Sequence, residues 1–372
     1  MKKKKVLFIL HIPPPIHGAS LVGQYIKESE KINDVFNAHY IDLTVSNNFE
    51  ETSRFKIWKI LRLIKLNIKV LWVILCNNYD LCYMTMSAKG PGFYKDSIIV
   101  FILKLFRRKI IFHFHNKGIS NQEDNKVNNF LYKTILKNTQ TILLSKNLYF
   151  DIKKYVKAED IYYCANGIPI TQSLIAHDNA LKDHTQPVKI LFLSNMMVEK
   201  GFFELLTACK ILKDKGLNFE CHFVGDWTEI TEESFSKAVS NYNLSKFVFA
   251  HGKKYNGEKL VFFKNSDIFA LPTYYHNECY PLVILEAMQH SLPVISTFEG
   301  AISEMVINNE TGFVGAQRDI LFLADKLEYL IANPEVRLKM GAAGKKRFNN
   351  FYTIDVFEKK MIEIISKSIQ RN

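Results

Sequence analysis

The sequence has few cysteines, and no two of them are spaced as a recognised pair. Its 372 residues include six cysteines, and none stands in a C-x-x-C arrangement with another. This pattern argues against a zinc site and against the disulfide framework of a small secreted protein. We therefore expect free thiols in a reducing cytosol and no structural metal. The six are Cys76, Cys82, Cys164, Cys209, Cys221 and Cys279.

Long uninterrupted apolar runs are also missing. Four lysines near the start precede only a short run, Val6–Leu10, which a histidine and three prolines then interrupt. A signal peptide needs a longer apolar region, so we expect a first core strand here. The apolar segment 54–76 carries several cations, each costing ~2.5–3.5 kcal/mol at the centre of a bilayer. We do not expect this segment to cross a membrane.

Positive charge is concentrated in the first half of the chain. Residues 1–170 contain 26 Lys and Arg against 13 Asp and Glu, a net charge of +13, whereas residues 171–372 contain 23 against 24. A basic half favours an anionic partner. The chain has no recognised nucleic-acid reader motif, so nucleic acid is not expected. Phosphate-rich small molecules and lipid surfaces are the expected partners.

The cations of segment 54–76 follow a helical spacing of 3-3-3-4, which keeps them near one face of a helix. One interpretation is a basic amphipathic helix that lies on an anionic membrane. The other is a core helix with a solvated lysine face. The pattern alone does not separate the two, although the charge of the first half favours the membrane. The cations are Lys56, Lys59, Arg62, Lys65 and Lys69.

Short β-branched and aromatic runs alternate with helical patterns along the chain, which predicts parallel sheets built from β-α-β units. A polar stretch without periodicity, 171–187, is expected to be a linker. We therefore predict an α/β fold with two doubly wound Rossmann-like domains facing a cleft, at 1–170 and 188–350. The expected strands are 6–11, 38–43, 81–86, 110–115, 141–145 and 161–164, then 189–194, 220–224, 247–251, 268–272 and 294–297.

Residues 276–297 contain the most informative pattern. Glu278 stands just before an expected helix, and Glu286 follows eight positions later inside a helix that is otherwise apolar. An unpaired carboxylate there costs several kcal/mol or gives up its charge, so Glu286 needs a partner. Pro281 suits the first helical position, where free amides can hold an anion such as a phosphate. A buried structural Glu beside an Arg or Lys explains the spacing equally well.

This segment resembles the E-x7-E signature of retaining, nucleotide-sugar-dependent glycosyltransferases of family 4, which have the GT-B fold. Four further stretches are similar to motifs of that family and follow its order, so that the resemblance covers residues 160–316. The stretches are NGIP at 166–169, VEKG at 198–201, DIFALPT at 267–273 and ETGFV at 310–314.

The resemblance implies roles for residues of the second domain, which would hold the nucleotide. Glu286 would bind the ribose hydroxyls of the donor, and Glu278 the hydroxyls of the donor sugar. Lys200 would contact the diphosphate. The backbone that follows Glu278 would face the sugar and the phosphate, at Cys279, Tyr280, Pro281 and Leu282.

In the first domain the resemblance implies that His115 and Gly18 close the site. His115 matches a family histidine at a strand end better than His113 does. The family's usual glycine pair is reduced to Gly18, because His17 occupies the other position. By the same resemblance, the last helix, 351–372, would pack back on the first domain.

Two positions depart from the family pattern. Asn195 stands where the family has an arginine that clamps the diphosphate, and Ser194 stands where it has a glycine. Asn195 can donate a hydrogen bond to the donor but brings no charge. The chain also has no D-x-D, which argues against the metal-carrying GT-A type. We therefore expect no metal cofactor, and Lys200 with helix amides would stabilise the leaving group.

The sequence thus predicts transfer of a sugar from a nucleotide diphosphate sugar to an acceptor hydroxyl. By resemblance, the acceptor would be a polyprenol-linked or polysaccharide intermediate of bacterial capsule, O-antigen or exopolysaccharide synthesis, at the cytoplasmic face of the cell membrane. One alternative is a GT-B-type nucleotide-sugar epimerase, which needs no acceptor. Another is a basic peripheral-membrane adaptor without catalysis. A glycosidase is less favoured, because hydrolysis needs both carboxylates beside one bond.

Overall fold

The computed structural model describes residues 2–44, 57–171, 186–254 and 256–371. The chain divides into two units, one formed by Met1–Gly167 with Ile354–Asn372 and the other by Ile168–Thr353. We call them unit 1 and unit 2. Each contains a six-stranded sheet whose neighbouring strands are parallel. This architecture confirms the predicted α/β class. Most of the expected linker, 171–187, lies outside the described residues.

The sheet of unit 1 has the strand order β2-β1-β3-β4-β5-β6. The first strand is internal and the order reverses on its two sides, so the switch point lies between β1 and β3. Ligands of open parallel sheets bind at the carboxyl ends of the strands beside such a point. The strands are β1 (Lys5–Leu10), β2 (Asn37–Asp42), β3 (Leu81–Met86), β4 (Ile110–Phe114), β5 (Gln140–Leu143) and β6 (Ile161–Tyr163).

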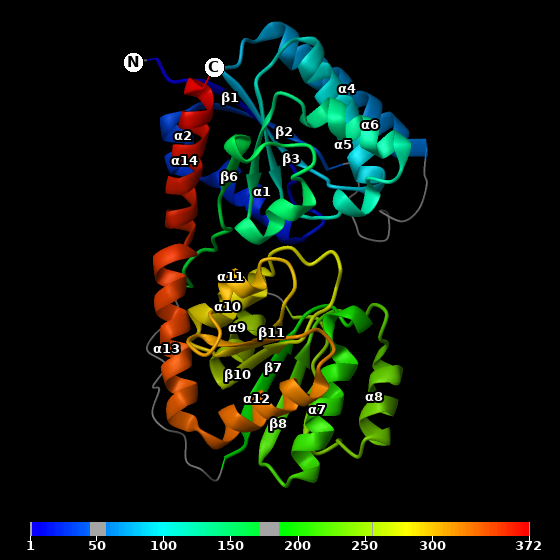
Figure 1. Cartoon of the computed structure of the whole chain (residues 1–372), viewed down its shortest axis with the longest axis vertical. Helices are drawn as coiled ribbons and strands as arrows, with labels where there is room; N and C mark the ends of the chain where they lie inside the picture. Colours follow the sequence, from blue (N-terminus) through cyan, green and yellow to red (C-terminus); the bar gives the residue numbers. More distant parts are fainter. Residues whose placement is uncertain (1, 45–56, 172–185, 255, 372) are drawn as a thin grey trace. The chain divides into compact units, whose positions relative to one another are not determined.

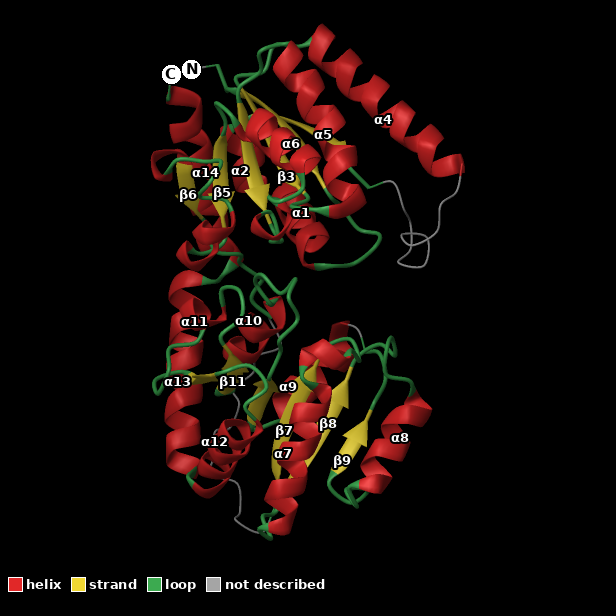
Figure 2. Ribbon diagram, turned by 45° about the vertical axis from the view of Figure 1, so that its right-hand side comes forward, coloured by secondary structure: helices red, strands yellow, loops and turns green. Residues whose placement is uncertain are grey.

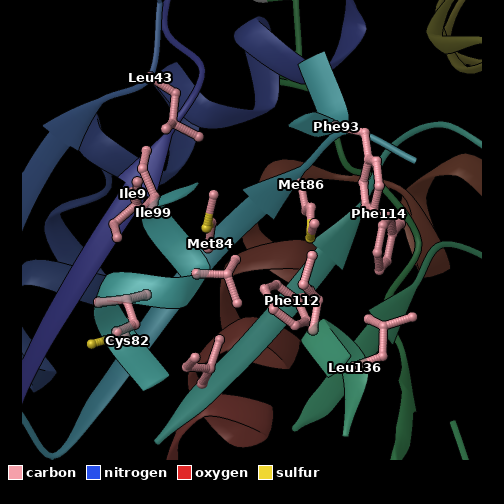
Figure 3. Packing of buried hydrophobic residues seen from close by; sticks show 14 of the residues in the cluster. Ile9, Leu43, Cys82, Met84, Met86, Phe93, Ile99, Phe112, Phe114 and Leu136 are labelled. Atoms are coloured by element: carbon pink, nitrogen blue, oxygen red, sulfur yellow. The ribbon is translucent and has the colours of Figure 1, made fainter. Parts of the chain in front are cut away.

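Helices cover both faces of this sheet, as Figure 1 shows. Because side chains alternate along a strand, Leu7 and Ile9 of β1 point to one face, while Val6 and Phe8 point to the other. The first face packs against α4 (Ile57–Cys76), α5 (Gly90–Leu105) and α6 (Lys126–Leu136), and Figure 3 shows part of this core. The second face packs against α1 (Gly18–Glu28), α2 (Glu30–Val35) and α14 (Ile354–Gln370).

The sheet of unit 2 has the order β12-β11-β10-β7-β8-β9, so its switch point lies between β7 and β10. Its helices are distributed over the two faces of the sheet (Figure 2). The strands are β7 (Val188–Leu193), β8 (Phe219–Val224), β9 (Val248–Ala250), β10 (Ile268–Leu271), β11 (Val294–Thr297) and β12 (Gly312–Gly315). The helices are α7 (Phe202–Asp214), α8 (Glu232–Asn241), α9 (Asn256–Asn265), α10 (Leu282–Gln289), α11 (Ile302–Met305), α12 (Ile320–Ala332) and α13 (Pro334–Phe351).

All eleven expected strands are present, with ends displaced by at most two residues. One strand, β12, was not expected. It is four residues long and two of these are glycines, which have low β propensity. Within the described residues, the expected helix at 54–76 is present as α4 (Ile57–Cys76), and residues 54–56, Lys56 among them, lie outside the described ranges.

The last helix, α14, contributes a buried apolar stripe to unit 1. Phe357, Met361, Ile364 and Ile365 lie on this stripe and pack with Val6 and other residues of the second face. Their spacing of three and four residues keeps them on one side of the helix. Unit 1 is therefore completed by residues that follow unit 2 in the chain.

We expect Met361→Ala to lower the free energy of unfolding by about 2–5 kcal/mol, because Met361 is fully buried and the variant leaves a cavity. Urea unfolding measures the change. Lys359→Ala is the control on the same helix, since the Lys359 side chain is 70% exposed. Equal stability of the two variants would contradict the packing of α14.

Candidate functional site

Two loops meet at the switch point of unit 2. The loop after β7 contains a short 3-10 helix, Val198–Lys200, and leads into α7. The loop after β10 spans residues 272–281 and leads into α10. Because β7 and β10 are neighbours and parallel, both loops emerge at the same edge of the sheet. Lys200 and Glu278, which are 78 positions apart, are thereby brought together.

Gly201 allows the two loops to approach closely. Its φ angle is +86°, which disfavours other residues, and a Cβ at this position would lie 2.2 Å from the carbonyl oxygen of Pro272. A backbone hydrogen bond of 2.8 Å from the Tyr274 N–H to the Glu199 carbonyl joins the same loops. The backbone therefore fixes where Lys200 stands relative to the loop after β10.

Lys200 and Glu278 form an ion pair that is largely withdrawn from water. Lys200 Nζ lies 2.5 Å from Glu278 Oε2, and the two side chains are 14% and 11% exposed. The ammonium also lies 4.6 Å from the ring centroid of Tyr275, close enough for a cation–π contact. The pair provides a preorganised cation beside an oriented carboxylate.

Glu286 forms a second ion pair, with Lys259 of α9. Lys259 Nζ lies 2.5 Å from Glu286 Oε1, whereas Glu286 Oε2 is buried and has no hydrogen-bond partner among the described residues. Lys259 is thus the basic partner that a Glu in an apolar helix needs. The other carboxylate oxygen, Oε2, can still accept a hydrogen bond. The sequence interpretation missed Lys259. Its position in the first turn of α9, where cations are disfavoured, was the only signal.

The start of α10 differs from the expectation for Pro281. The helix begins at Leu282, and Pro281 precedes it with an extended conformation (φ −70°, ψ 106°). The first turn still presents amides without intrahelical acceptors, at Leu282 and Val283. The Cys279 carbonyl accepts a 2.9 Å hydrogen bond from the Ala301 N–H, which fixes the loop through Cys279 and Tyr280.

Asn195 is exposed in the loop after β7, on the same edge of the sheet. This loop packs against Gly225, where a Cβ would lie 1.8 Å from the carbonyl oxygen of Ser194. The Met196 N–H donates a 2.8 Å hydrogen bond to the Asp226 carbonyl. The backbone around Asn195 is thus held in place, although its side chain adds no positive charge.

His113 and His115 lie in unit 1 and differ in their surroundings. His113 is fully buried in β4, and its Nδ1 lies 2.5 Å from the hydroxyl of Tyr83. His115 follows β4, and neither of its ring nitrogens has a hydrogen-bond partner among the described residues. Burial lowers the pKa of His115 to about 3, with a smaller contribution from His11 and His17. The structure thus gives His115 an imidazole that is neutral at pH 7.

Gly18 is the first residue of α1, directly after the loop that follows β1. His17 caps this helix: its Nδ1 accepts a 3.2 Å hydrogen bond from the Ser20 N–H, and Ser20 Oγ accepts one from the His17 N–H. This capping box gives a structural reason for a histidine beside Gly18. Gly18 and His115 belong to unit 1, whereas the ion pairs belong to unit 2.

Several further features of the described residues bear on the site. Within the described ranges, no three His, Cys, Asp or Glu side chains are grouped so as to hold a metal ion. All six cysteines are described and carry free thiols. No described helix combines the length and the apolar character that crossing a membrane requires.

Residues 176–347, a little less than half of the chain, match the family described as glycosyl transferases group 1. Together with the two doubly wound sheets, this match supports the GT-B glycosyltransferase superfamily as the class of the protein.

Particular relatives agree with this class. The chain is 28% identical over 168 residues to the capsular polysaccharide biosynthesis glycosyltransferase CapM of Staphylococcus aureus, covering 44% of this chain and 42% of the relative. It is 25% identical over 235 residues to the putative colanic acid biosynthesis glycosyltransferase WcaL of Escherichia coli K12, covering 60% and 56%. The chain thus spans about half the length of these relatives.

Among solved structures, HepE from Anabaena in complex with UDP superimposes with a TM-score of 0.76 over 98% of this chain and 100% of that one. The sequence identity is 17%, so this similarity concerns the fold.

The neutral state of His115 predicts a pH dependence of stability. The unfolded chain takes up a proton at His115 near pH 6.5, whereas the folded pKa of about 3 keeps the ring neutral. Stability is therefore lost as the pH falls below 6.5. Between pH 7.5 and 5, we expect the wild type to lose about 2 kcal/mol more than His115→Gln, as measured by urea unfolding. Leu321→Gln, an exposed position of unit 2 without a titratable group, is the control and should behave like the wild type. Equal losses in the wild type and in His115→Gln would contradict the neutral assignment.

Proposed function

We propose that this protein is a retaining glycosyltransferase of family 4, which transfers a sugar from a nucleotide diphosphate donor to an acceptor hydroxyl. The observation that carries the proposal is the Lys200–Glu278 pair at the switch point between β7 and β10, with Lys200 Nζ 2.5 Å from Glu278 Oε2. In this position Lys200 can stabilise negative charge that develops on the leaving diphosphate. The match to group 1 glycosyl transferases, over the part of the chain that contains the pair, supports the assignment.

Each carboxylate has a separate role in the proposed reaction. Glu278, oriented by Lys200, accepts hydrogen bonds from hydroxyls of the donor sugar. Glu286 accepts hydrogen bonds from the ribose diol, with Lys259 holding one of its oxygens. The backbone of residues 279–282 faces the sugar and phosphate. The Asn195 side chain donates a hydrogen bond to the donor without adding charge. In unit 1, His115 contributes a neutral imidazole and Gly18 a backbone without a side chain.

The paired lysines also bear on hydrolysis. A glycosidase uses two carboxylates that flank one glycosidic bond. Here Glu278 and Glu286 are each bound by a different lysine, and the lysines come from different elements. Two carboxylates held in this way suit substrate binding better than they suit an acid–base pair.

The proposed acceptor is a polyprenol-linked or polysaccharide intermediate of bacterial surface glycan synthesis. The similarity to CapM, a glycosyltransferase of capsular polysaccharide biosynthesis, and to WcaL, a putative glycosyltransferase of colanic acid biosynthesis, supports this class. The net charge of +13 on residues 1–170 supports action at the anionic inner face of the cell membrane. The donor is a nucleotide sugar, as in the HepE complex with UDP-glucose.

Donor binding tests the role of Glu286. Glu286→Gln removes charge-assisted hydrogen bonds worth about 1.5–3 kcal/mol, so the affinity for UDP or GDP should fall about ten- to a hundredfold. Calorimetric titration of both nucleotides measures this change. Glu335→Gln, an exposed position of unit 2 outside the quoted motifs, is the control. Wild-type affinity in Glu286→Gln would mean that the ribose is held elsewhere.

Turnover tests the reaction itself. Release of free nucleotide from the donor should depend on added acceptor and persist in excess EDTA, because the chain has no D-x-D and Lys200 takes the diphosphate charge. Lys200→Met should lower turnover by about 100-fold or more while thermal unfolding stays cooperative. Conversion of the donor to an epimeric nucleotide sugar without acceptor would favour the epimerase, and no reaction at all would favour the adaptor. Complete loss on chelation, restored by manganese, would contradict metal independence.

A further inference from the structure

Exposed apolar side chains gather on one layer of unit 1. The described residues include 24 large hydrophobic side chains that are exposed, and 14 of these belong to α4, α5 and α6. The three helices lie side by side over one face of the sheet (Figure 1), and eight of the 14 side chains are on α4. Two of these eight are tryptophans, Trp58 and Trp72, which are 68% and 65% exposed. A patch of this kind marks a surface that another component covers.

Helix α4 has three distinct faces. Leu66, Val70 and Ile74 form its buried stripe against the core of unit 1. At 100° per residue, Leu61, Ile68 and Leu75 lie on the opposite side, and all three are exposed. Arg62, Lys65 and Lys69 form a flank between these two faces. The cations of the described part of α4 share one side of the helix, as their spacing predicts, but the side opposite the buried stripe is apolar and the cations lie beside it.

The charges of this layer are almost all positive. Helices α4 and α6 contain no Asp or Glu, and the single acid of α5, Asp96, is fully buried. The same helices carry lysines and arginines on their exposed sides, including Arg62 and Lys69. Three helices that present apolar side chains and cations, and no exposed acid of their own, complement an anionic lipid headgroup layer.

We propose that the outer face of α4, continued by Ile98, Phe101 and Leu105 of α5, inserts into an anionic bilayer at headgroup depth. The apolar side chains enter the interface, and the cationic flank contacts lipid phosphates. α4 has 20 residues and is about 30 Å long, so it lies in the plane of the membrane. The inference deepens the proposed action at a membrane and rests on it for the identity of the acceptor. It adds that apolar insertion, and not charge alone, holds the protein there.

The topology connects the start of this helical layer to the proposed site of unit 1. α5 follows β3 directly and α6 follows the loop after β4, so both helices begin at the carboxyl edge of the parallel sheet. The Ala88 N–H, just before α5, donates a 3.0 Å hydrogen bond to Asn116 Oδ1, in the residue after His115. A lipid-linked acceptor whose head group reaches the starts of α5 and α6 would lie beside the sheet edge that carries His115.

The tryptophans of the chain provide a direct probe of insertion. The chain has three, and Trp227→Phe leaves only Trp58 and Trp72, both on α4. This variant of the full chain is mixed with vesicles of phosphatidylcholine, alone or with phosphatidylglycerol. We expect the emission to shift to the blue and lipids brominated on the upper acyl chain to quench it. Unchanged emission without quenching, for both vesicle types, would overturn the proposal.

Two triple variants separate insertion from adsorption. The apolar triple variant, Leu61→Gln with Ile68→Gln and Leu75→Gln, should bind vesicles more weakly by about 100-fold or more, whatever the lipid charge. The charge triple variant, Arg62→Gln with Lys65→Gln and Lys69→Gln, should bind anionic vesicles about 100-fold more weakly. Its binding to neutral vesicles should be unchanged. Leu321→Gln, an exposed leucine of unit 2, is the matched control. If only the charge variant loses binding, the protein adsorbs without insertion and the proposal is wrong.

A second copy of the chain is the rival occupant of this face. Sedimentation without lipid decides between them: a wild-type dimer that the apolar triple variant converts to monomers would overturn membrane insertion. Nucleotide titration of the same variants separates this proposal from the proposed function. If the protein binds vesicles but neither UDP nor GDP, the membrane-binding proposal stands and the proposed transferase function is wrong. If the protein binds a nucleotide but no vesicles, the proposed transferase function stands and the membrane-binding proposal is wrong.

Discussion

The ammonium of Lys200 and the carboxylate of Glu278 are both withdrawn from water, so the backbone around them must hold them together. Removing one partner of such a pair costs about 3–5 kcal/mol, because the other charge remains buried. Much of the local structure of unit 2 serves this constraint. The strand order makes β7 and β10 neighbours, and Gly201 lets their loops touch at Pro272. Contacts from Gly300 and Ala301 hold the backbone beside Glu278 from the other side.

The same constraint explains how this site can accept a strongly charged ligand. Each of the two glutamates is neutralised by its own lysine, so the four side chains add no net charge to the edge of the sheet. A diphosphate brings at least two negative charges, and Asn195 offers no positive charge to balance them. In the proposed reaction, Lys200 therefore exchanges part of its interaction with Glu278 for the phosphate, and the amides at the start of α10 supply the remaining stabilisation.

Local patterns predicted most of the fold and part of the site. The strands of both sheets were predictable because each is a short apolar run bounded by turn residues. β12 was not, because two of its four residues are glycines and its pairing with β11 is a contact that no local pattern encodes. Pro281 was misplaced by one position, since propensity does not separate the residue before a helix from its first residue. The Lys259–Glu286 pair joins two helices across 27 positions, and no local pattern encodes such a contact.

Helix α4 shows why one sequence pattern allowed two interpretations, a membrane-surface helix and a core helix. Its cations recur every three or four residues, and this spacing alone is consistent with either a membrane surface or a solvated core helix. What distinguishes them is the third face, which becomes visible only once the buried stripe is known. A core helix needs one apolar stripe, and Leu66, Val70 and Ile74 already provide it. The second apolar stripe, through Leu61 and Ile68, adds nothing to the core and exposes apolar surface that favours aggregation. Such a stripe is explained when another apolar phase covers it, and the absence of exposed acids on α4–α6 makes an anionic lipid layer the phase that fits.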